Sequence, residues 1–235
     1  SDLNHAIICA NANVTSTDTI ELASNIVFTT PYEADAVFGR TATAVISSPI
    51  ILDGKGYKLE RDYNLGCQIN GADDSEKFRL FRIENNSGNG FLNLTHIVLT
   101  NGCADDPNPA SKKNFGGAIF NDGQLAISGS EIDTNDAGAG GGIYNDTGTI
   151  THLVNSTLSN NYALFSGGAL FNSTGQINNI ENSTFSKNSV NQFQGGAIHK
   201  DSGDIGLISN STFSANTANN SSGGAIYNGS GNIIA

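Results

Sequence analysis

The chain is built on an internal repeat. Five segments begin with two glycines, continue with a small and an aliphatic residue, and mostly end in asparagine: GGAIFN (116–121), GGGIYN (140–145), GGALFN (167–172), GGAIHK (195–200) and GGAIYN (223–228). Their starts are 24, 27, 28 and 28 residues apart. Between them lie GSEIDTN (129–135), NSTLSNN (155–161), NSTFSKN (182–188) and NSTFSAN (210–216). Two elements that recur in register at nearly one period predict a solenoid.

The residue types in the repeat decide which solenoid forms. The chain holds 28 glycines and 31 asparagines, and its repeats add Ser, Thr, Ile and Phe, which suit short strands and turns better than helices. A period of 24 to 28 residues accommodates three short strands and three turns. Parallel crossovers are right-handed by strong preference. We therefore predict an all-β fold, a right-handed three-strand-per-coil parallel β-helix of roughly eight coils.

In such a coil each residue stacks on its equivalent about 4.8 Å away in the next coil. The repeat predicts an aliphatic stack in the core (Ile119, Ile143, Leu170, Ile198, Ile226) and a neighbouring column of rings (Phe120, Tyr144, Phe171, His199, Tyr227). It also predicts a second apolar stack (Ile132, Leu158, Phe185, Phe213) and an asparagine ladder at a turn (Asn135, Asn161, Asn188, Asn216). The paired glycines predict a corner that needs positive φ or close approach.

We expect a single domain over 1–235, with an N-terminal cap (1–19), irregular coils (20–115) and regular coils (116–235). Leu3, Ala6, Ile7 and Ala10 have the spacing of one helix face, so residues 2–12 are expected to form a helical lid with Ser1 or Asp2 as N-cap. Further rungs are expected at 50–59, 78–83 and 91–99, and a loop leaving the coil at 103–113. Ile233-Ile234 lies inside a coil, so either more sequence follows or that edge meets another molecule.

The paired elements resemble a known repeat. Gly116-Gly117-Ala118-Ile119 with Ile132-x-x-Asn135, and onward to Gly195-Gly196-Ala197-Ile198 with Phe213-x-x-Asn216, are similar to the repeats of the chlamydial polymorphic outer-membrane proteins, which are autotransporter passengers. The resemblance covers about half of the chain.

The N-terminus is similar to bacterial secreted β-helix proteins that open with a CSLREA motif. The matching residues are 3–7 (LNHAI), 10–13 (ANAN) and 18–22 (DTIEL), with Ser1 in the place of Cys and Asn4-His5 in the place of Arg-Glu. Both resemblances imply a secreted or cell-surface protein with an adhesive or structural role.

Charge and cysteine content narrow the function further. The net charge is −11, and no basic stripe of the kind that binds nucleic acid is visible. Residues 116–235 contain only two basic residues, Lys187 and Lys200. No run of 18 apolar residues predicts a membrane span. Cys9, Cys67 and Cys103 allow one disulfide in an oxidising compartment or buried free thiols, and the spacing does not choose between these alternatives.

Right-handed β-helices also include polysaccharide lyases and hydrolases, so catalytic residues need to be considered. Asp73-Asp74 and Asp105-Asp106 are adjacent carboxylates, but both pairs lie in Gly- or Pro-containing segments where acidic residues are ordinary turn formers. A lyase would use Arg or Lys as base beside calcium-binding carboxylates. Candidates by residue type alone are Arg40, Arg61, Arg79 and Arg82. We expect Arg79 and Arg82 to flank a rung as solvated charges, with Glu84 the one acidic neighbour.

The sequence contains only weak indications of metal-binding or glycosylation sites. The four histidines (His5, His96, His152, His199) lack a zinc-binding spacing, and His199 is expected to pack in the ring column. Asp53-Gly54 and Asp122-Gly123 are turns that calcium sometimes uses. Asn-x-Ser/Thr sequons such as Asn155-Ser156-Thr157 and Asn182-Ser183-Thr184 arise from the repeat itself.

These observations favour a non-catalytic extracellular structural or adhesive β-helix presented at or outside the bacterial cell surface. We expect no catalytic, cofactor-binding or metal-binding residues. Its partners are expected to be itself, in a head-to-tail or lateral filament, or surface glycans and proteins. The alternative is a polysaccharide lyase or hydrolase, which rests on fold analogy alone.

Overall fold

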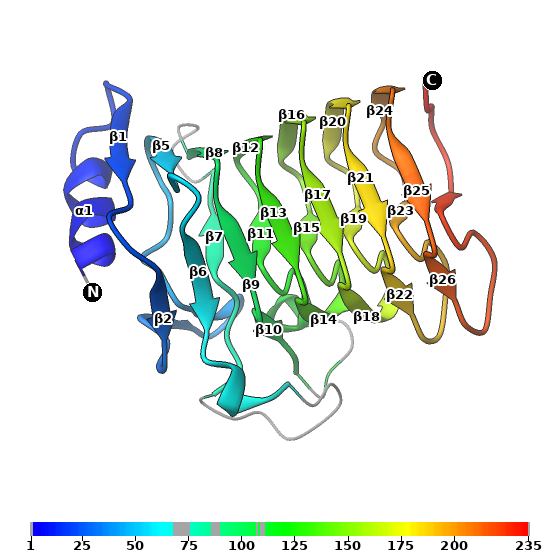
Figure 1. The fold of residues 1–235 in the computed structure, drawn as a ribbon, viewed down its shortest axis with the longest axis horizontal. Coiled ribbons are helices and arrows are strands. Elements are labelled where there is room, and N and C mark those ends of the chain that lie inside the picture. Colours follow the sequence, from blue (N-terminus) through cyan, green and yellow to red (C-terminus); the bar gives the residue numbers. More distant parts are fainter. Residues whose placement is uncertain (1, 68–75, 86–89, 107, 109–110, 235) are drawn as a thin grey trace.

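The chain winds into stacked coils in the computed structural model (Figure 1), which describes residues 2–67, 76–85, 90–106, 108 and 111–234. Parallel strands of successive coils pair with their equivalents in neighbouring coils. In Figure 1 the chain passes down the near face, returns behind it, and advances from the N-terminal to the C-terminal end, so the coil is right-handed. The predicted all-β parallel β-helix is confirmed.

Four sheets run along the rod, and we number them as sides 1 to 4 in the order in which a coil visits them. Side 1 contains β1 (Asp18–Glu21), β5 (Pro49–Asp53), β8 (Phe91–Thr95), β12 (Gln124–Ser128), β16 (Thr149–Val154), β20 (Gln176–Glu181) and β24 (Ile205–Ser209). Side 2 contains β2 (Ile26–Phe28), β6 (Lys58–Arg61), β9 (Val98–Thr100), β13 (Glu131–Asp133), β17 (Thr157–Ser159), β21 (Thr184–Ser186) and β25 (Thr212–Ser214).

Sides 3 and 4 are shorter. Side 3 contains β10 (Cys103–Ala104), β14 (Asp136–Ala139), β18 (Tyr162–Ser166), β22 (Ser189–Val190) and β26 (Thr217–Ala218). Side 4 contains β7 (Phe81–Ile83), β11 (Ile119–Asn121), β15 (Ile143–Asn145), β19 (Leu170–Asn172), β23 (Ile198–Lys200) and β27 (Ile226–Asn228). A bridge between Ile205 and Ile233 continues side 1 beyond its seventh strand, which agrees with roughly eight coils.

A regular coil therefore has four strands rather than the predicted three, because its last side bends at the paired glycines. Gly140, between β14 and β15, has a φ of 62°. A Cβ atom there would lie 2.4 Å from the carbonyl oxygen of Ile143, so a side chain is excluded. The equivalent glycine of each other GG pair has positive φ as well. The corner separates a short strand on side 3 from the strand on side 4.

The core consists of the predicted stacks. The strand registers align the aliphatic residues of side 4 and the apolar residues of side 2 coil by coil, as the repeat predicted. Side 1 adds a third column, which contains Leu92, Leu125, Ile150, Ile177 and Ile205. Most of these side chains are fully buried. Each such burial contributes about 1.5–3 kcal/mol of hydrophobic free energy.

The predicted asparagine ladder forms at the turn between sides 2 and 3. The Nδ2 atom of Asn135 donates to Oδ1 of Asn161 at 3.0 Å, Asn161 to Asn188 at 3.0 Å, and Asn188 to Asn216 at 2.9 Å. Each acceptor Oδ1 also accepts from the backbone N–H of the preceding ladder asparagine. The ladder thus satisfies buried backbone groups that the turn leaves unpaired.

Two further ladders were not predicted. At the end of side 4, Asn121 donates to Asn145 and Asn145 to Asn172, each at 2.6 Å. At the turn between sides 1 and 2, Ser130, Ser156, Ser183 and Ser211 connect coils through backbone N–H to Oγ hydrogen bonds of 3.2 Å.

The serine ladder explains why the tripeptide Asn-Ser-Thr recurs in the sequence. Asn155 adopts the positive φ of the turn, Ser156 joins the serine ladder, and Thr157 begins the next strand with its side chain outward. The same three roles recur in the coils that start at Asn182 and Asn210. The sequons therefore follow from the coil geometry.

The N-terminal lid is confirmed as α1 (Asp2–Asn11), which lies across the first coil (Figure 1). Leu3, Ile7 and Ala10 are buried beneath it. Two asparagines of this helix, Asn4 and Asn11, have a role that was not predicted. Asn4 donates to the Ala42 carbonyl at 3.2 Å and accepts from the Ala44 N–H at 2.8 Å. Asn11 pairs in the same way with Val45 and Ser47.

The irregular coils contain excursions that the sequence did not predict. An antiparallel hairpin of β3 (Glu33–Asp35) and β4 (Gly39–Thr41) leaves the first coil. Two short 3₁₀ helices follow, η1 (Tyr63–Leu65) and η2 (Lys112–Asn114). The loop expected at 103–113 begins later, because Cys103 and Ala104 pair with β14 as part of side 3. Among the described residues, no helix is long and apolar enough to cross a membrane.

Candidate functional surfaces

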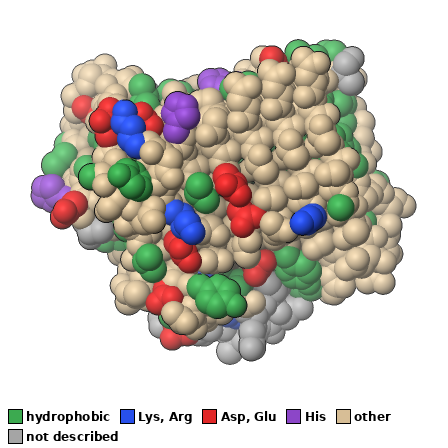
Figure 2. All heavy atoms as spheres, in the orientation of Figure 1, with side chains coloured by type: hydrophobic (Ala, Val, Ile, Leu, Met, Phe, Trp, Pro, Cys, Tyr) green, Lys and Arg blue, Asp and Glu red, His purple; other side chains and the backbone are tan. Residues whose placement is uncertain are grey.

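Side 2 presents an uncharged outer face over β17, β21 and β25, which we call the hydroxyl face. The middle residue of each strand points into the core, and the flanking residues of β21 and β25 are partly or fully exposed. In β17 Thr157 is partly exposed, whereas Ser159 is buried and donates to Asp133 at 2.7 Å. The registers align threonines 157, 184 and 212 in one column and serines 159, 186 and 214 in another. Glu131 and Asp133 take these positions in β13, so the face ends there. Figure 2 shows charged side chains gathered over the N-terminal coils and sparse over this part.

Side 4 presents the predicted ring column on its outer face. Consecutive rings from Phe120 to Tyr227 stack nearly parallel, with centroids 4.6 to 5.6 Å apart. His199 lies between Phe171 and Tyr227, as expected. Such stacks contribute about 0.5–1.5 kcal/mol per pair beyond the burial of their surface.

The irregular coils cover the N-terminal end of the ring column. Phe38, from the turn of the β3–β4 hairpin, packs edge-on against Phe120 with centroids 5.5 Å apart. Lys112 crosses above both rings and its Nζ lies 2.6 Å from Oδ2 of Asp146. Phe171 and Tyr227 remain partly exposed. The column is therefore closed at one end and accessible at the other.

A hollow of about 540 Å³ lies between the ring column and side 3. We call it the aromatic trough. Tyr144, Phe171 and His199 line one wall, and Phe165 and Phe193 belong to side 3 and to the loop after β22. Phe193 is 50% exposed and lies 6.2 Å from Phe165, ring centre to ring centre. Its lining also includes the exposed carboxylate of Asp201 and the ring of Phe115, which stacks on Tyr144 at 4.4 Å.

Two carboxylates share a column beside the rings. Asp122 and Asp146 follow β11 and β15 directly, at equivalent positions of neighbouring coils, which lie about 4.8 Å apart. Burial raises the pKa of Asp122, and the nearby Asp146 carboxylate raises it further. The pair was not predicted from the sequence, where the candidate carboxylates were adjacent residues, whereas Asp122 and Asp146 are 24 positions apart and meet only through the stacking of coils.

Two arginines that were expected to be solvated are in fact buried. Arg79 is 1% exposed and Arg82 is 7% exposed. The guanidinium of Arg79 donates to backbone carbonyls of the hairpin and of the η2 segment, at Phe38, Lys112, Lys113, Phe115 and Gly116. Burial lowers its pKa to about 9, so it stays charged at neutral pH. Arg82 lies 3.3 Å from both Asp35 and Glu84.

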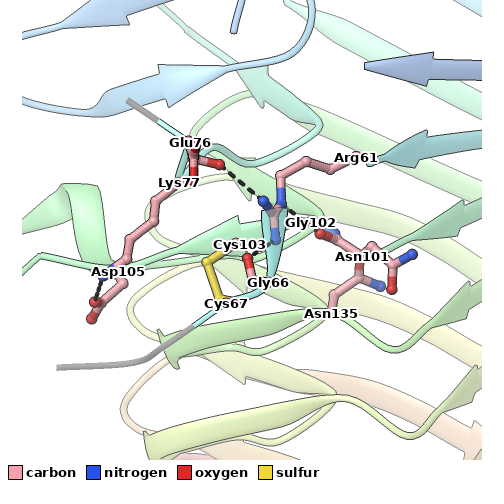
Figure 3. The surroundings of a disulfide bond; sticks show 10 residues. All are labelled: Arg61, Gly66, Cys67, Glu76, Lys77, Asn101, Gly102, Cys103, Asp105 and Asn135. Carbon is pink, nitrogen blue, oxygen red and sulfur yellow. Dashed lines mark hydrogen bonds and ion pairs between the residues drawn. A yellow bond between two sulfur atoms is a disulfide. The ribbon is translucent and has the colours of Figure 1, made fainter. Parts of the chain in front are cut away.

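A disulfide joins Cys67 to Cys103 beside a third buried arginine (Figure 3), while Cys9 is free and exposed. The guanidinium of Arg61 donates to the carbonyls of Asn101 at 2.8 Å, Glu76 at 2.9 Å and Gly66. The disulfide closes a loop with a sequence separation of 36 residues. A loop of that size is expected to add about 3–4 kcal/mol of stability in the chain-entropy model. Arg61 and the disulfide therefore organise an irregular segment of the coil.

Most of the remaining candidate catalytic or metal-binding residues form ion pairs or turn hydrogen bonds. Asp105 is buried in an ion pair with Lys77 at 2.6 Å, and Asp106 caps a turn by accepting from the Asn108 N–H. Asp73-Asp74 lies outside the described residues. Arg40 lies in the hairpin strand β4, half-buried. Asp53 contacts Lys55 at 2.9 Å. Across the described residues, no group of three or more His, Cys, Asp or Glu side chains is arranged to hold a metal ion.

Comparison of the chain with protein-family models, with curated proteins and with solved structures found no match.

Proposed function

We propose that this protein is a non-catalytic extracellular adhesive module, presented at or outside the bacterial cell surface, that binds surface glycans or proteins. The observation that carries the proposal is the hydroxyl face. Its threonine and serine side chains stand on parallel strands paired in register, and β17 and β21 have a neighbouring strand on both sides. Groups held in this way lose little conformational entropy when they bind a partner. A charge-free surface of this kind suits uncharged polar partners.

One further observation supports an extracellular setting. The Cys67–Cys103 disulfide is a bond that persists in oxidising compartments and is rare in the cytosol.

Charged substitutions on the hydroxyl face test the proposal. Replacing Thr157, Thr184 and Thr212 together by lysine is expected to reduce retention on glycan- or glycoprotein-coated surfaces at least about tenfold, because each ammonium group would have to be desolvated against the partner. The matched control replaces Gln124, Gln176 and Asn178 by lysine. These residues are exposed on side 1, so the control adds the same charge to another face. Equal retention of the two variants and the wild type would remove the hydroxyl face from the proposal.

Self-association of rods, end to end or side by side, remains a prediction. In this structure α1 covers the N-terminal coil, and Ile8 on its outer surface is 43% exposed. Negative-stain electron microscopy at micromolar concentration separates the alternatives. Fibres with a repeat near one rod length would support a filament, and isolated short rods would contradict it.

A polysaccharide hydrolase is the second candidate, and the Asp122–Asp146 pair is the observation that favours it. Burial and the nearby Asp146 carboxylate raise the pKa of Asp122, which suits a general acid, and the ammonium group of Lys112 lies 2.6 Å from Asp146. An acid and a carboxylate base are what glycoside hydrolysis requires. In this structure the ion pair with Lys112 occupies the Asp146 carboxylate, and neither Asp122 nor Asp146 lines the trough. The adhesive role is therefore the better supported of the two.

A further inference from the structure

We infer that the aromatic trough is a binding site for an uncharged glycan chain that runs along the axis of the rod. This inference rests on the proposed adhesive function and names a ligand class and a second surface for it. The trough crosses three coils, from Tyr144 through Phe171 to His199. Neighbouring coils are about 4.8 Å apart, which is close to the length of one pyranose unit.

The orientation of the rings defines what the trough can bind. Tyr144, Phe171 and His199 stack face to face, with interplanar angles of 5° and 6°. Their faces are therefore covered by one another, and their edges are turned toward the trough. Ring edges carry the positive part of the aromatic quadrupole. This wall attracts electron-rich oxygen atoms and disfavours cations.

The opposite wall offers an apolar surface. Phe193 is half-exposed, and its ring is tilted by 27° against Phe165. A ligand between the two walls thus meets an aromatic side chain on one side and ring edges on the other. A pyranose matches both, since its C–H faces are apolar and its rim carries hydroxyl oxygens.

The charges near the trough exclude other ligand classes. Asp201 lines the trough, and its carboxylate forms no ion pair with any described residue. A carboxylate accepts hydrogen bonds from sugar hydroxyls and repels anionic polymers. Lys112 forms an ion pair with Asp146 at the covered end of the ring column, and it does not line the trough. An uncharged, hydroxyl-rich chain is the ligand that fits the ring edges and Asp201 together.

The test uses isothermal titration calorimetry and NMR with soluble oligosaccharides of four to six units from uncharged glycans, and with polygalacturonate and chitosan oligomers as anionic and cationic comparisons. We expect at least one uncharged series to bind and to perturb resonances of Phe193 and His199. Phe193→Ala should raise the dissociation constant at least about tenfold, because an aromatic contact surface is lost, and Asp201→Asn about three- to tenfold. The control is Tyr63→Ala, because Tyr63 is 75% exposed and lies away from the trough.

Three results would overturn the trough site: no binding of any uncharged oligomer at millimolar concentration, binding of only a charged series, or equal affinity of the Phe193→Ala, Asp201→Asn and Tyr63→Ala variants. Both trough variants change side chains that are at least half-exposed or lie at the surface, so folding is preserved and is checked by circular dichroism. Adhesion that depends on the hydroxyl face, in a protein that binds no soluble uncharged oligosaccharide, would defeat the trough site alone. Oligosaccharide binding by a protein that adheres to no surface would defeat the adhesive function alone.

Discussion

Replacing Arg79 by methionine is expected to lower the free energy of unfolding by about 3–5 kcal/mol, the size of effect seen when buried charged networks are broken. The guanidinium of Arg79 supplies hydrogen bonds to carbonyl groups on two separate excursions of the chain, the hairpin and the η2 segment. Methionine fills a similar volume but leaves those carbonyls unpaired, and each unpaired buried group costs about 1–3 kcal/mol. Urea denaturation followed by circular dichroism measures the difference.

Two companion variants sharpen this test. Arg79→Lys keeps the charge but loses the planar fork of donors, so it is expected to recover less than half of the lost stability. Lys58→Met removes an exposed cation whose nearest carboxylate is 3.8 Å away, and should change stability by less than about 1 kcal/mol. An Arg79→Met variant as stable as Lys58→Met would show that Arg79 does not hold the two excursions in place.

Replacing Lys200 by asparagine is expected to raise the free energy of unfolding by about 1–3 kcal/mol. Lys200 occupies the fourth position of the side 4 ladder, between Asn172 and Asn228 in register, and is fully buried. Its Nζ atom has no hydrogen-bond partner among the described residues. An asparagine there would offer an Oδ1 acceptor to the Nδ2 atom of Asn172, as Asn145 and Asn172 do for the preceding residues of the ladder.

The comparison with Lys200→Met separates two causes of this gain. Methionine removes the buried charge without extending the ladder, so it should stabilise the protein less than asparagine does. Thermal unfolding of the three proteins in parallel gives the order wild type, Lys200→Met, Lys200→Asn from least to most stable. A loss of stability in Lys200→Asn would mean that the ammonium group has a stabilising role that the ladder cannot replace.

The repeat predicts much of this fold because the strands of each coil hydrogen-bond and pack against the equivalent strands of the next coil. Ile119, Ile143 and Leu170 stack as expected, since equivalent positions in a solenoid have no other neighbour. What the sequence did not reveal depends on single contacts. The capping of coil 1 by Asn4 and the carbonyl-binding role of Arg79 involve partners 38 and 36 residues away, with no periodic signal to predict them. The bend that divides the last side follows from a positive φ at Gly140, which the GG pair suggested only as a corner.

The candidate surfaces were predictable in part. The alternation in Thr-Phe-Ser and the column of rings could be aligned from the sequence, and the structure confirms both alignments. The trough could not be predicted, because its second wall depends on Phe165 and Phe193, which are not repeated in the other coils. The Asp122–Asp146 pair was likewise visible only after the coils were stacked.

An adhesive protein of this kind should bind a glycan without cleaving it. To test this, the purified wild-type protein is incubated with a panel of uncharged, anionic and cationic polysaccharides, and both the retained protein and the length of every polysaccharide are measured. We expect reversible retention on an uncharged glycan, with no new reducing ends and no unsaturated products. Shortened chains, whose release disappears in the Asp122→Asn variant, would contradict this expectation and identify the protein as a hydrolase.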